Sequence, residues 1–421
     1  MSQDEPEQIV GMSGDERGLV DIIHRDQSRL IGRTLDWCAV NSGSRNLAGL
    51  LAVADQLEAE LGRLAPVRRI ELEPLDEVGP TGEPARTRTG PCLRADLRPD
   101  APVQVVLTGH YDTVFPPSSG FQAVTQRADG ALNGPGVADM KGGISVMLGA
   151  LEAFEQHPLA ERVGWRVLLS PDEEIGSLAS APELARVAEG AHLGLTYEPA
   201  LAGGALASSR KGSGNFSVIV KGRAAHAGRD FAAGRNAVTA AARIAGTLDA
   251  LNGRREGVTV NVARIEGGAP SNQVPDRAVL RFNVRLPQAE DRAWIEAALP
   301  GALDAGRGEG LEVSLHGGFT RPPKPISAAQ QQLFDGVRET AGLLDIDLNW
   351  TPSGGVCEGN NLYAAGLPNL DTLGVRGGDI HTEAEHAWPD SFAERAALSA
   401  LILARIASGA IDARAIRAAM G

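Results

Sequence analysis

The chain has 421 residues, of which 43% are hydrophobic and 22% charged, a composition typical of a globular protein. A single hydrophobic core seldom grows beyond about 250–300 residues, so we expect two domains. The formal net charge of −13 repels phosphate backbones, and no basic stripe with interleaved aromatic side chains offsets it, so we expect no nucleic-acid partner.

The sequence also predicts a cytoplasmic protein without a membrane anchor. Residues 1–10 are acidic and polar, whereas a signal peptide has a positive start and an apolar run. No apolar stretch reaches the roughly 20 residues that a membrane-spanning helix requires. The three cysteines, Cys38, Cys92 and Cys357, are odd in number and widely spaced, as expected of ordinary thiols in a reducing compartment.

The first half of the chain predicts an α/β sheet covered by helices. Residues 19–38 and 46–61 have the apolar spacing of amphipathic helices. Three short apolar, β-branched runs are typical of strands buried on both faces, at 103–107, 165–169 and 193–197. A helical segment at 144–154 separates the first two runs, which gives the strand–helix–strand alternation of an α/β fold.

From about residue 213 the pattern changes to strands that alternate with two helices of similar length. The predicted order is strand, helix, two strands, helix and strand, at 216–220, 236–251, 258–265, 278–284, 292–303 and 311–315. This is the βαββαβ order of a ferredoxin-like unit, so we expect an inserted α+β domain over residues 210–320. Residues 1–209 and 321–421 would form the other domain, with a strand at 370–375 and a last helix at 392–406.

Polar side chains follow the predicted strands where they end, and ligands of open α/β sheets bind at that edge. His110 comes soon after the strand at 103–107, and Asp112 points to the same side of an extended backbone. A carboxylate commonly orients a metal-bound imidazole, so His110 is a candidate ligand supported by Asp112. Taken alone, the pair could equally be a strand-end histidine capped by an aspartate.

Further carboxylates occupy comparable positions. Asp139 lies in the glycine-rich turn 133–143 and could bridge two cations, one on each oxygen; the turn lacks the spacing of phosphate-binding loops. Glu173 and Glu174 follow the strand at 165–169, and adjacent glutamates can divide the work of binding a metal and accepting a proton from water. By themselves they could also form a solvated acidic loop.

Two more candidates complete the set. Glu198 follows the strand at 193–197, and His381 comes after the predicted strand at 370–375. Four predicted strands therefore lead to candidate ligands, which independent coincidences would rarely produce. Two histidines and three carboxylates without a cysteine suit two divalent ions, and we expect zinc, although cobalt or manganese can occupy such ligand sets.

These motifs resemble the M20 metallopeptidase family, which includes glutamate carboxypeptidases, acetylornithine and succinyl-diaminopimelate deacylases, aminoacylases and dipeptidases. The resemblance extends from about His24 to the end of the chain. The segments GHYDTV, GPGVADMKGG and SPDEEIGS are most similar to the glutamate carboxypeptidase branch. The implied fold is an α/β zinc-peptidase domain, with a mixed central sheet flanked by helices, and an inserted α+β ferredoxin-like lid or dimerisation domain.

The resemblance also implies how the metal-site residues share their roles. His110 and Glu198 would bind one zinc ion, and Glu174 and His381 would bind the other. Asp139 would bridge the two ions. Glu173 would be the general base, and Asp112 would support His110.

In the inserted domain the resemblance implies substrate contacts. His226, in the segment GRAAHAG, would reach the active site of a neighbouring subunit and polarise the scissile carbonyl, which implies a homodimer formed through this domain. Asn272 matches a turn whose asparagine contacts substrate, and Gly355 would bring backbone close to the site. Either Arg285 or Arg321 could hold a substrate carboxylate through paired hydrogen bonds.

The expected reaction is hydrolysis of an amide bond next to a free carboxylate in a small peptide or N-acyl amino acid, as in carboxypeptidases of the glutamate carboxypeptidase type. An N-acyl-amino-acid deacylase or a dipeptidase could use the same site, and a non-catalytic metal or ligand binder could keep the fold. The presence of Glu173 argues against the last alternative. Many family members have Ser-Asp or Thr-Asp after the glycine pair, where this chain has Val356, Cys357 and Glu358, which leaves substrate choice open.

Overall fold

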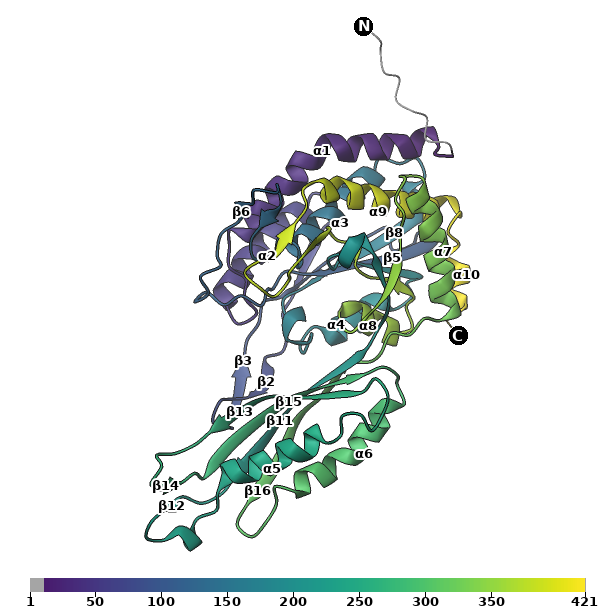
Figure 1. Cartoon of the computed structure of the whole chain (residues 1–421). Helices are drawn as coiled ribbons and strands as arrows, with labels where there is room; N and C mark the ends of the chain where they lie inside the picture. The colour runs from purple at the N-terminus through teal and green to yellow at the C-terminus, as the bar shows by residue number, and fades with distance from the viewer. Residues whose placement is uncertain (1–10, 421) are drawn as a thin grey trace.

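The structure of the chain is a computed structural model that describes residues 11–420. A large α/β part carries a smaller α+β part that extends from it (Figure 1). The expectation that residues 1–10 are not a signal peptide concerns residues outside the described range. Between residues 11 and 420, every helix is too short or too polar to cross a membrane. The three cysteines are free and buried, and the cytoplasmic location stays a prediction.

A six-stranded mixed sheet forms the centre of the larger part. In sheet order its strands are β1 (Val67–Ile70), β4 (Cys92–Leu97), β8 (Val163–Ser170), β5 (Val103–His110), β9 (Leu193–Thr196) and β18 (Asn369–Leu370). The last four run parallel to one another, whereas β4 and β1 are antiparallel to their neighbours. The carboxyl ends of the parallel strands therefore meet at one edge.

Helices cover both faces of this sheet. One face packs against α2 (Leu47–Leu61), α3 (Lys141–Phe154), α7 (Ala328–Gly342) and α9 (Asp390–Ser408), and α1 (Gly14–Cys38) lies over α3 and α9 (Figure 1). The other face packs against α4 (Ala181–Ala188) and α8 (Glu358–Ala364). Successive side chains of a strand point to opposite faces, so Val105 and Leu107 pack toward α3 and α9, whereas Val106 packs toward α4 and α8. The helix α10 (Ala413–Ala418) lies against α7.

Local chemistry explains where the elements begin and end. The helix predicted from Leu19 begins at Gly14, because Ser13 and Glu16 form a capping box at its amino end. The strand predicted at 370–375 was wrong, since β18 ends at Leu370. Beyond it the backbone of Thr372 has a φ of +68°, which is incompatible with an extended strand.

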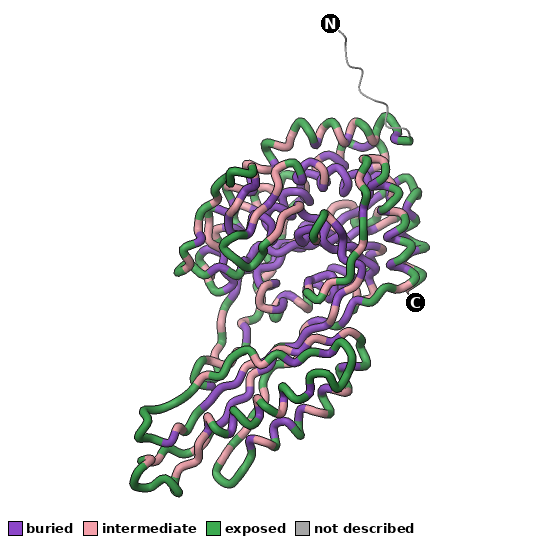
Figure 2. Tube along the Cα trace, viewed as in Figure 1, coloured by how far each residue is buried: buried purple, intermediate pink, exposed green. Residues whose placement is uncertain are grey.

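The smaller part, which we call the lid, comprises residues 212–321. Its elements are β11 (Gly212–Lys221), α5 (Ala237–Asp249), β13 (Thr259–Gly267), β15 (Arg277–Leu286), α6 (Asp291–Asp304) and β16 (Glu312–Arg321). The sheet order β13-β15-β11-β16 is antiparallel throughout, and α5 and α6 cover one face, so the ferredoxin-like unit is confirmed. Figure 2 shows the buried residues between this sheet and its helices.

A hairpin from the larger part crosses to the other face of the lid sheet. It consists of β2 (Leu75–Val78) and β3 (Pro84–Thr87). The Arg281 guanidinium of β15 donates to the backbone carbonyls of Val78 and Gly79 at 2.9 and 3.1 Å. A Cβ at Gly82 would lie 2.8 Å from Ile219, so only glycine fits this approach without a shift. The hairpin therefore ties the lid to the larger part.

Short strands complete the structure. A four-stranded ribbon pairs β19 (Gly377–Gly378), β20 (His386–Ala387), β7 (Leu132–Asn133) and β6 (Thr125–Gln126). Parallel β10 (Leu206–Arg210) and β17 (Trp350–Ser353) lie near the lid connections, and β12 (Ala225–His226) pairs with β14 (Gln273–Val274) inside the lid.

A buried ion cluster fixes the two connections that lead into and out of the lid. The backbones of Arg210 and Lys324 donate to each other at 2.9 Å in both directions. Their side chains both bind Asp371, with Arg210 Nη2 at 2.8 Å and Lys324 Nζ at 2.7 Å from its carboxylate oxygens. All three side chains are buried, so one carboxylate balances two buried cations.

This cluster makes stability depend on the Asp371 charge. Burial opposes ionisation, but the two cations outweigh it and lower the pKa of Asp371 from 3.8 to about 2. Asp371→Asn should reduce the free energy of unfolding by about 3–5 kcal/mol at pH 7, because two buried cations lose their partner. Because the pKa of Asp371 is lower in the folded than in the unfolded protein, its ionised form stabilises the fold fully above pH 3.8. The loss of stability in Asp371→Asn should therefore shrink as the pH falls from 3.8 towards 2.

Urea unfolding of metal-free protein, followed by circular dichroism, measures this difference. Exposed Asp100→Asn serves as the control and should unfold as the parent does. A deficit that is absent at pH 7, or that stays constant down to pH 2, would contradict the cluster's proposed contribution.

Candidate metal centre

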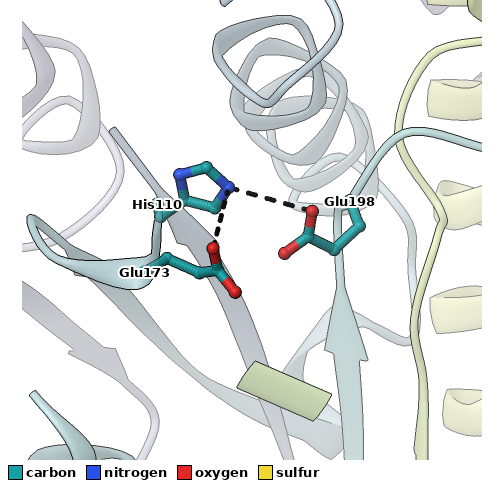
Figure 3. Close-up of side chains that lie close together, drawn as sticks. All are labelled: His110, Glu173 and Glu198. Atoms are coloured by element: carbon teal, nitrogen blue, oxygen red, sulfur yellow. Dashed lines mark ion pairs between the residues drawn. The ribbon is translucent and has the colours of Figure 1, made fainter. Parts of the chain in front are cut away.

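The predicted ligands meet at the carboxyl edge of the six-stranded sheet. His110 is the last residue of β5, Glu198 comes two residues after β9, and Glu173 and Glu174 lie in a one-turn 3-10 helix after β8. Asp139 precedes α3. Figure 3 shows His110, Glu173 and Glu198 pointing toward one another from adjacent strand ends.

The buried histidine faces three carboxylates. His110 Nε2 lies 3.0 Å from Asp139 Oδ1, 3.8 Å from Glu198 Oε2 and 4.0 Å from Glu173 Oε2. The last two contacts are the dashed lines of Figure 3. Only 1% of the His110 side chain is exposed, so this side of the site is buried.

The second histidine approaches from the opposite side of Asp139. His381 Nε2 lies 3.3 Å from Asp139 Oδ2 and 3.1 Å from Glu174 Oε2. Each oxygen of Asp139 thus faces a different histidine, which is the arrangement that a bridging carboxylate requires. Since 53% of the His381 side chain is exposed, solvent and small molecules can reach this side.

The unsatisfied oxygens of the site suit a divalent cation. Glu174 Oε1 and Glu198 Oε1 are buried and have no hydrogen-bond partner. A buried carboxylate oxygen without a partner is costly, and a cation would satisfy it. Across residues 11–420, two overlapping donor sets lie close enough to hold an ion: His110 with Glu173 and Glu198, and His110 with Asp139 and Glu174.

Electrostatics give the same indication. Burial raises the pKa of Glu173 to about 7 and that of Glu174 to about 8, and neighbouring carboxylates add to both shifts. Hydrogen bonds to Asp139 and Glu174 raise the pKa of His381 to about 11. Burial disfavours the Asp139 charge, but hydrogen bonds to His110 and His381 outweigh it and lower its pKa. Bound divalent cations would neutralise the negative charge of these carboxylates, which the two histidines balance only in part.

Asp112 lies behind His110. Its Oδ1 is 3.3 Å from His110 Nδ1, and its two oxygens accept from the backbone N–H groups of Glu173 and Glu174 at 3.1 and 3.2 Å. The Ser44 hydroxyl donates to Oδ2 at 2.7 Å. One buried carboxylate therefore positions both the histidine and the turn that carries the two glutamates.

Sequence reasoning missed a second supporting carboxylate, Glu385. It is buried, and its Oε1 accepts from the backbone N–H groups of Ala138 and Asp139, both at 3.1 Å. Burial and the Asp139 charge raise the pKa of Glu385 to about 7. The only signal in the sequence is a pair of glutamates after His381, and it does not show which one turns back toward the site.

Comparison with known proteins supports the fold and the chemistry of this site. Residues 106–405 match the peptidase family M20/M25/M40. The chain belongs to this family. Carboxypeptidase G2 from Pseudomonas sp. strain RS-16 is 24% identical over 395 residues, which cover 91% of each chain. The family assignment confirms the resemblance found in the sequence, and it makes the protein a metallo-hydrolase.

One further relative and one solved structure are similar to the chain. Succinyl-diaminopimelate desuccinylase 2 from Shewanella loihica is 30% identical over 225 residues, 49% of this chain and 59% of that protein. The structure of the di-peptidase Dug1p from Saccharomyces cerevisiae matches with a TM-score of 0.77 at 14% identity, covering 94% of this chain and 99% of that one. The likeness to Dug1p establishes the fold.

The two arginines of this M20 peptidase have different surroundings. Arg321, at the end of β16, contacts Glu173 Oε1 at 2.7 Å and donates to the Glu173 carbonyl and the Ser177 hydroxyl at 2.9 and 2.8 Å. Its guanidinium thus holds a carboxylate of the protein. Arg285 is half-buried, and its Nη1 has no partner. Both arginines line a pocket of about 330 Å³ that Glu174 also borders.

The lid residues implied by the family lie apart from the metal residues. The Ala227 N–H donates to the Asn272 carbonyl at 2.8 Å, so the structure brings exposed His226 and Asn272 together. They lie at β12 and β14, at the end of the lid remote from β5 and β8 (Figure 1). Gly355 follows β17, and its N–H donates to the Ser353 hydroxyl at 3.1 Å.

Glu358, where this chain departs from the family pattern, lies inside the protein. The side chain is fully buried, and the Ser170 hydroxyl donates to its Oε1. Burial raises the pKa of this carboxyl well above its usual range. Because Glu358 has no exposed surface, it does not form part of the pocket wall.

The supporting role of Glu385 gives a test of the site. Glu385→Gln should weaken zinc binding about 10- to 100-fold, since it removes the charge that holds the turn around Asp139. Asp139→Asn should lower the number of zinc ions bound per chain. Competition with a coloured chelator measures the affinity, and mass spectrometry measures the stoichiometry.

The matched control is Glu383→Gln, because Glu383 is an exposed glutamate two residues from Glu385. Zinc binding of this variant should equal that of the parent. Parental zinc affinity in Glu385→Gln would show that the contact with the Asp139 turn does not affect the metal.

Proposed function

We propose that this M20 peptidase is a zinc-dependent carboxypeptidase that cleaves an amide bond next to a free carboxylate, as glutamate carboxypeptidases do. The observation that carries the proposal is the position of Glu173, adjacent to Glu174 and 4.0 Å from His110. The similarity to carboxypeptidase G2 over 91% of both chains supports this reaction. The substrate would be a small peptide or an N-acylated amino acid.

The donor geometry supports two zinc ions with a shared aspartate. One would bind His110 and Glu198, the other Glu174 and His381, and Asp139 would contribute one oxygen to each. Cobalt or manganese would suit the same nitrogen and oxygen donors. When bound, such ions supply Lewis acidity that polarises the scissile carbonyl and makes the attacking water more acidic.

In this reaction Glu173 accepts a proton from the attacking water and passes it to the leaving amine. A raised pKa suits this task, because a general base is most effective when its pKa lies near the working pH. Arg321 binds Glu173 Oε1 and leaves Oε2 directed at His110. Arg321 thereby serves as a positioning residue for the base.

The free carboxylate of the substrate is assigned to the pocket of about 330 Å³ beside Glu174. Arg285 supports this assignment, because its Nη1 is buried and unpartnered and a paired hydrogen bond to a carboxylate would satisfy it. A carboxylate there would also face Arg321. Backbone near Gly355 would close the same pocket, of which the neighbouring Val356 is part.

The second candidate is an N-acyl-amino-acid deacylase or a dipeptidase with the same metal site. The desuccinylase and di-peptidase relatives favour it, since neither is a carboxypeptidase by name. Hydrolysis of N-acylated glutamates, N-acetyl amino acids and dipeptides, compared by kcat/KM, distinguishes these reactions. A non-catalytic binder would hydrolyse none of them.

The assignment of Glu173 leads to a direct test. Glu173→Gln should bind zinc as the parent does but lower kcat for an N-acylglutamate by about 10²- to 10⁴-fold, the usual contribution of a general base. Liberated glutamate and metal content are measured on the same preparation. Exposed Glu161→Gln is the control. Near-parental turnover in Glu173→Gln with a full metal complement would refute the mechanism.

We also propose that His226 and Asn272 act on the site of a second subunit in a homodimer joined through the lids. Their exposure supports this proposal, because they lie at the end of the lid that is remote from β5, the strand that ends in His110 (Figure 1). There His226 would donate to the developing oxyanion.

Mixed dimers test this arrangement. Glu173→Gln and His226→Ala should each be nearly inactive alone. After the two variants are unfolded and refolded together, a mixed dimer contains one intact site, so about a quarter of parental activity should return. Light scattering reports the oligomeric state. No recovery, or a fully active monomer, would exclude action across subunits.

A further inference from the structure

The most exposed large apolar side chain between residues 11 and 420 lies at the lid tip, which we define as residues 223–235. Phe231 begins a one-turn 3-10 helix there and is 67% exposed, whereas the other exposed apolar side chains range from 37% to 52%. Single exposed apolar side chains are common on protein surfaces. The position of Phe231 relative to His226 and to the charges around it decides what this ring can do.

The backbone of the lid tip ties Phe231 to His226. The Asp230 N–H donates to the His226 carbonyl at 2.9 Å, and Phe231 follows directly. At the base of the tip, the backbones of Arg223 and Arg235 donate to each other at 3.0 and 2.8 Å. Five residues span at most about 18 Å when fully extended, and the turn shortens that reach. Wherever His226 binds, Phe231 therefore meets the surface close to it.

A small pocket beside the metal centre can receive this side chain. It has a volume of about 280 Å³ and is bordered by Glu174, with Val114, Pro116 and Pro117 on its apolar side. These three apolar residues are exposed, and every described residue that lines the pocket belongs to the larger part. Small-molecule sites usually begin at about 300 Å³, so the pocket suits a single side chain.

Charge favours a second copy of the chain as the source of that side chain. The lid contains 14 of the 40 basic residues and 11 of the 53 acidic ones, so the lid is net positive and the rest of the chain is strongly negative. Within the lid tip, three arginines outnumber one aspartate. The surface around the metal centre carries Glu174 and exposed Asp379 and Glu383. Opposite charges therefore attract a lid tip to the larger part of another copy.

We propose that Phe231 of one subunit inserts into the pocket beside the partner's Glu174 and anchors the lid tip over that metal centre. This inference rests on the proposed function, in which His226 acts across subunits. Phe231 is then a positioning residue, because it contacts the larger part of the partner and holds His226 near the substrate carbonyl. A buried aromatic side chain in a pocket is the usual form of an interface anchor.

Crosslinking tests the contact directly. Phe231→Cys and Pro117→Cys are combined in one chain, which is loaded with zinc and treated with a short bismaleimide. The three native cysteines are buried, so the reagent reaches the introduced thiols. Electrophoresis should show a product with twice the mass of the chain. Arg229→Glu, which reverses one charge of the lid tip, should lower its yield.

The matched control combines Phe231→Cys with Ile326→Cys, because Ile326 is 52% exposed and absent from the pocket wall. Neither this pair nor either of the single substitutions Phe231→Cys and Pro117→Cys should give the product of doubled mass.

Turnover supplies a second measurement. Phe231→Ala should keep its zinc and its dimeric state but lower kcat for an N-acylglutamate by about tenfold or more, a loss typical of a truncated interface anchor. Phe231→Leu keeps an apolar side chain and should recover most of the activity. Ile326→Ala is the control and should match the parent.

The outcomes separate this inference from the proposed function. A crosslinked dimer that hydrolyses neither N-acyl amino acids nor dipeptides would support the docking and overturn the function. Hydrolysis without the doubled product would overturn the docking and keep the function, and so would parental kcat in Phe231→Ala. A crosslink within one chain, or a monomer in light scattering, would also overturn the docking.

Discussion

The contacts of Asp139 with His110 and His381 are the constraint on which the rest of the site depends. Carboxylates crowd a buried edge where burial, together with the charges of neighbouring carboxylates, raises the pKa of Glu173 to about 7 and that of Glu174 to about 8. Two histidines only partly balance this charge. Burying so many carboxylates is unfavourable unless cations share the site, so a bound metal would stabilise the fold.

The surrounding structure holds this cluster through a few shared supports. Asp112 joins the end of β5 to the turn of the two glutamates, and Glu385 holds the turn of Asp139. Arg321 leaves the lid and binds Glu173, so the orientation of this carboxylate, the proposed general base, depends on the connection between the two parts. The cluster around Asp371 fixes that connection.

The parts predicted from the sequence were those set by local pattern. Parallel strands buried on both faces appear as apolar runs, and the βαββαβ order of the lid appears in the alternation of strands and helices. The strand expected at 370–375 failed for a non-local reason. Its residues are apolar enough, but Asp371 turns away to bind Arg210 and Lys324, which are remote in the sequence.

By itself, the sequence determined the family, the two-part α/β and α+β architecture, and the strand-end residues that could bind metal, because strand periodicity and contiguous motifs express these locally. Only the tertiary structure decided that Arg321 contacts Glu173, that Glu385 supports Asp139 and that Glu358 is buried. A side chain's partner depends on which distant segment packs against it. That choice is made by the packing of the whole chain, and no local pattern encodes it.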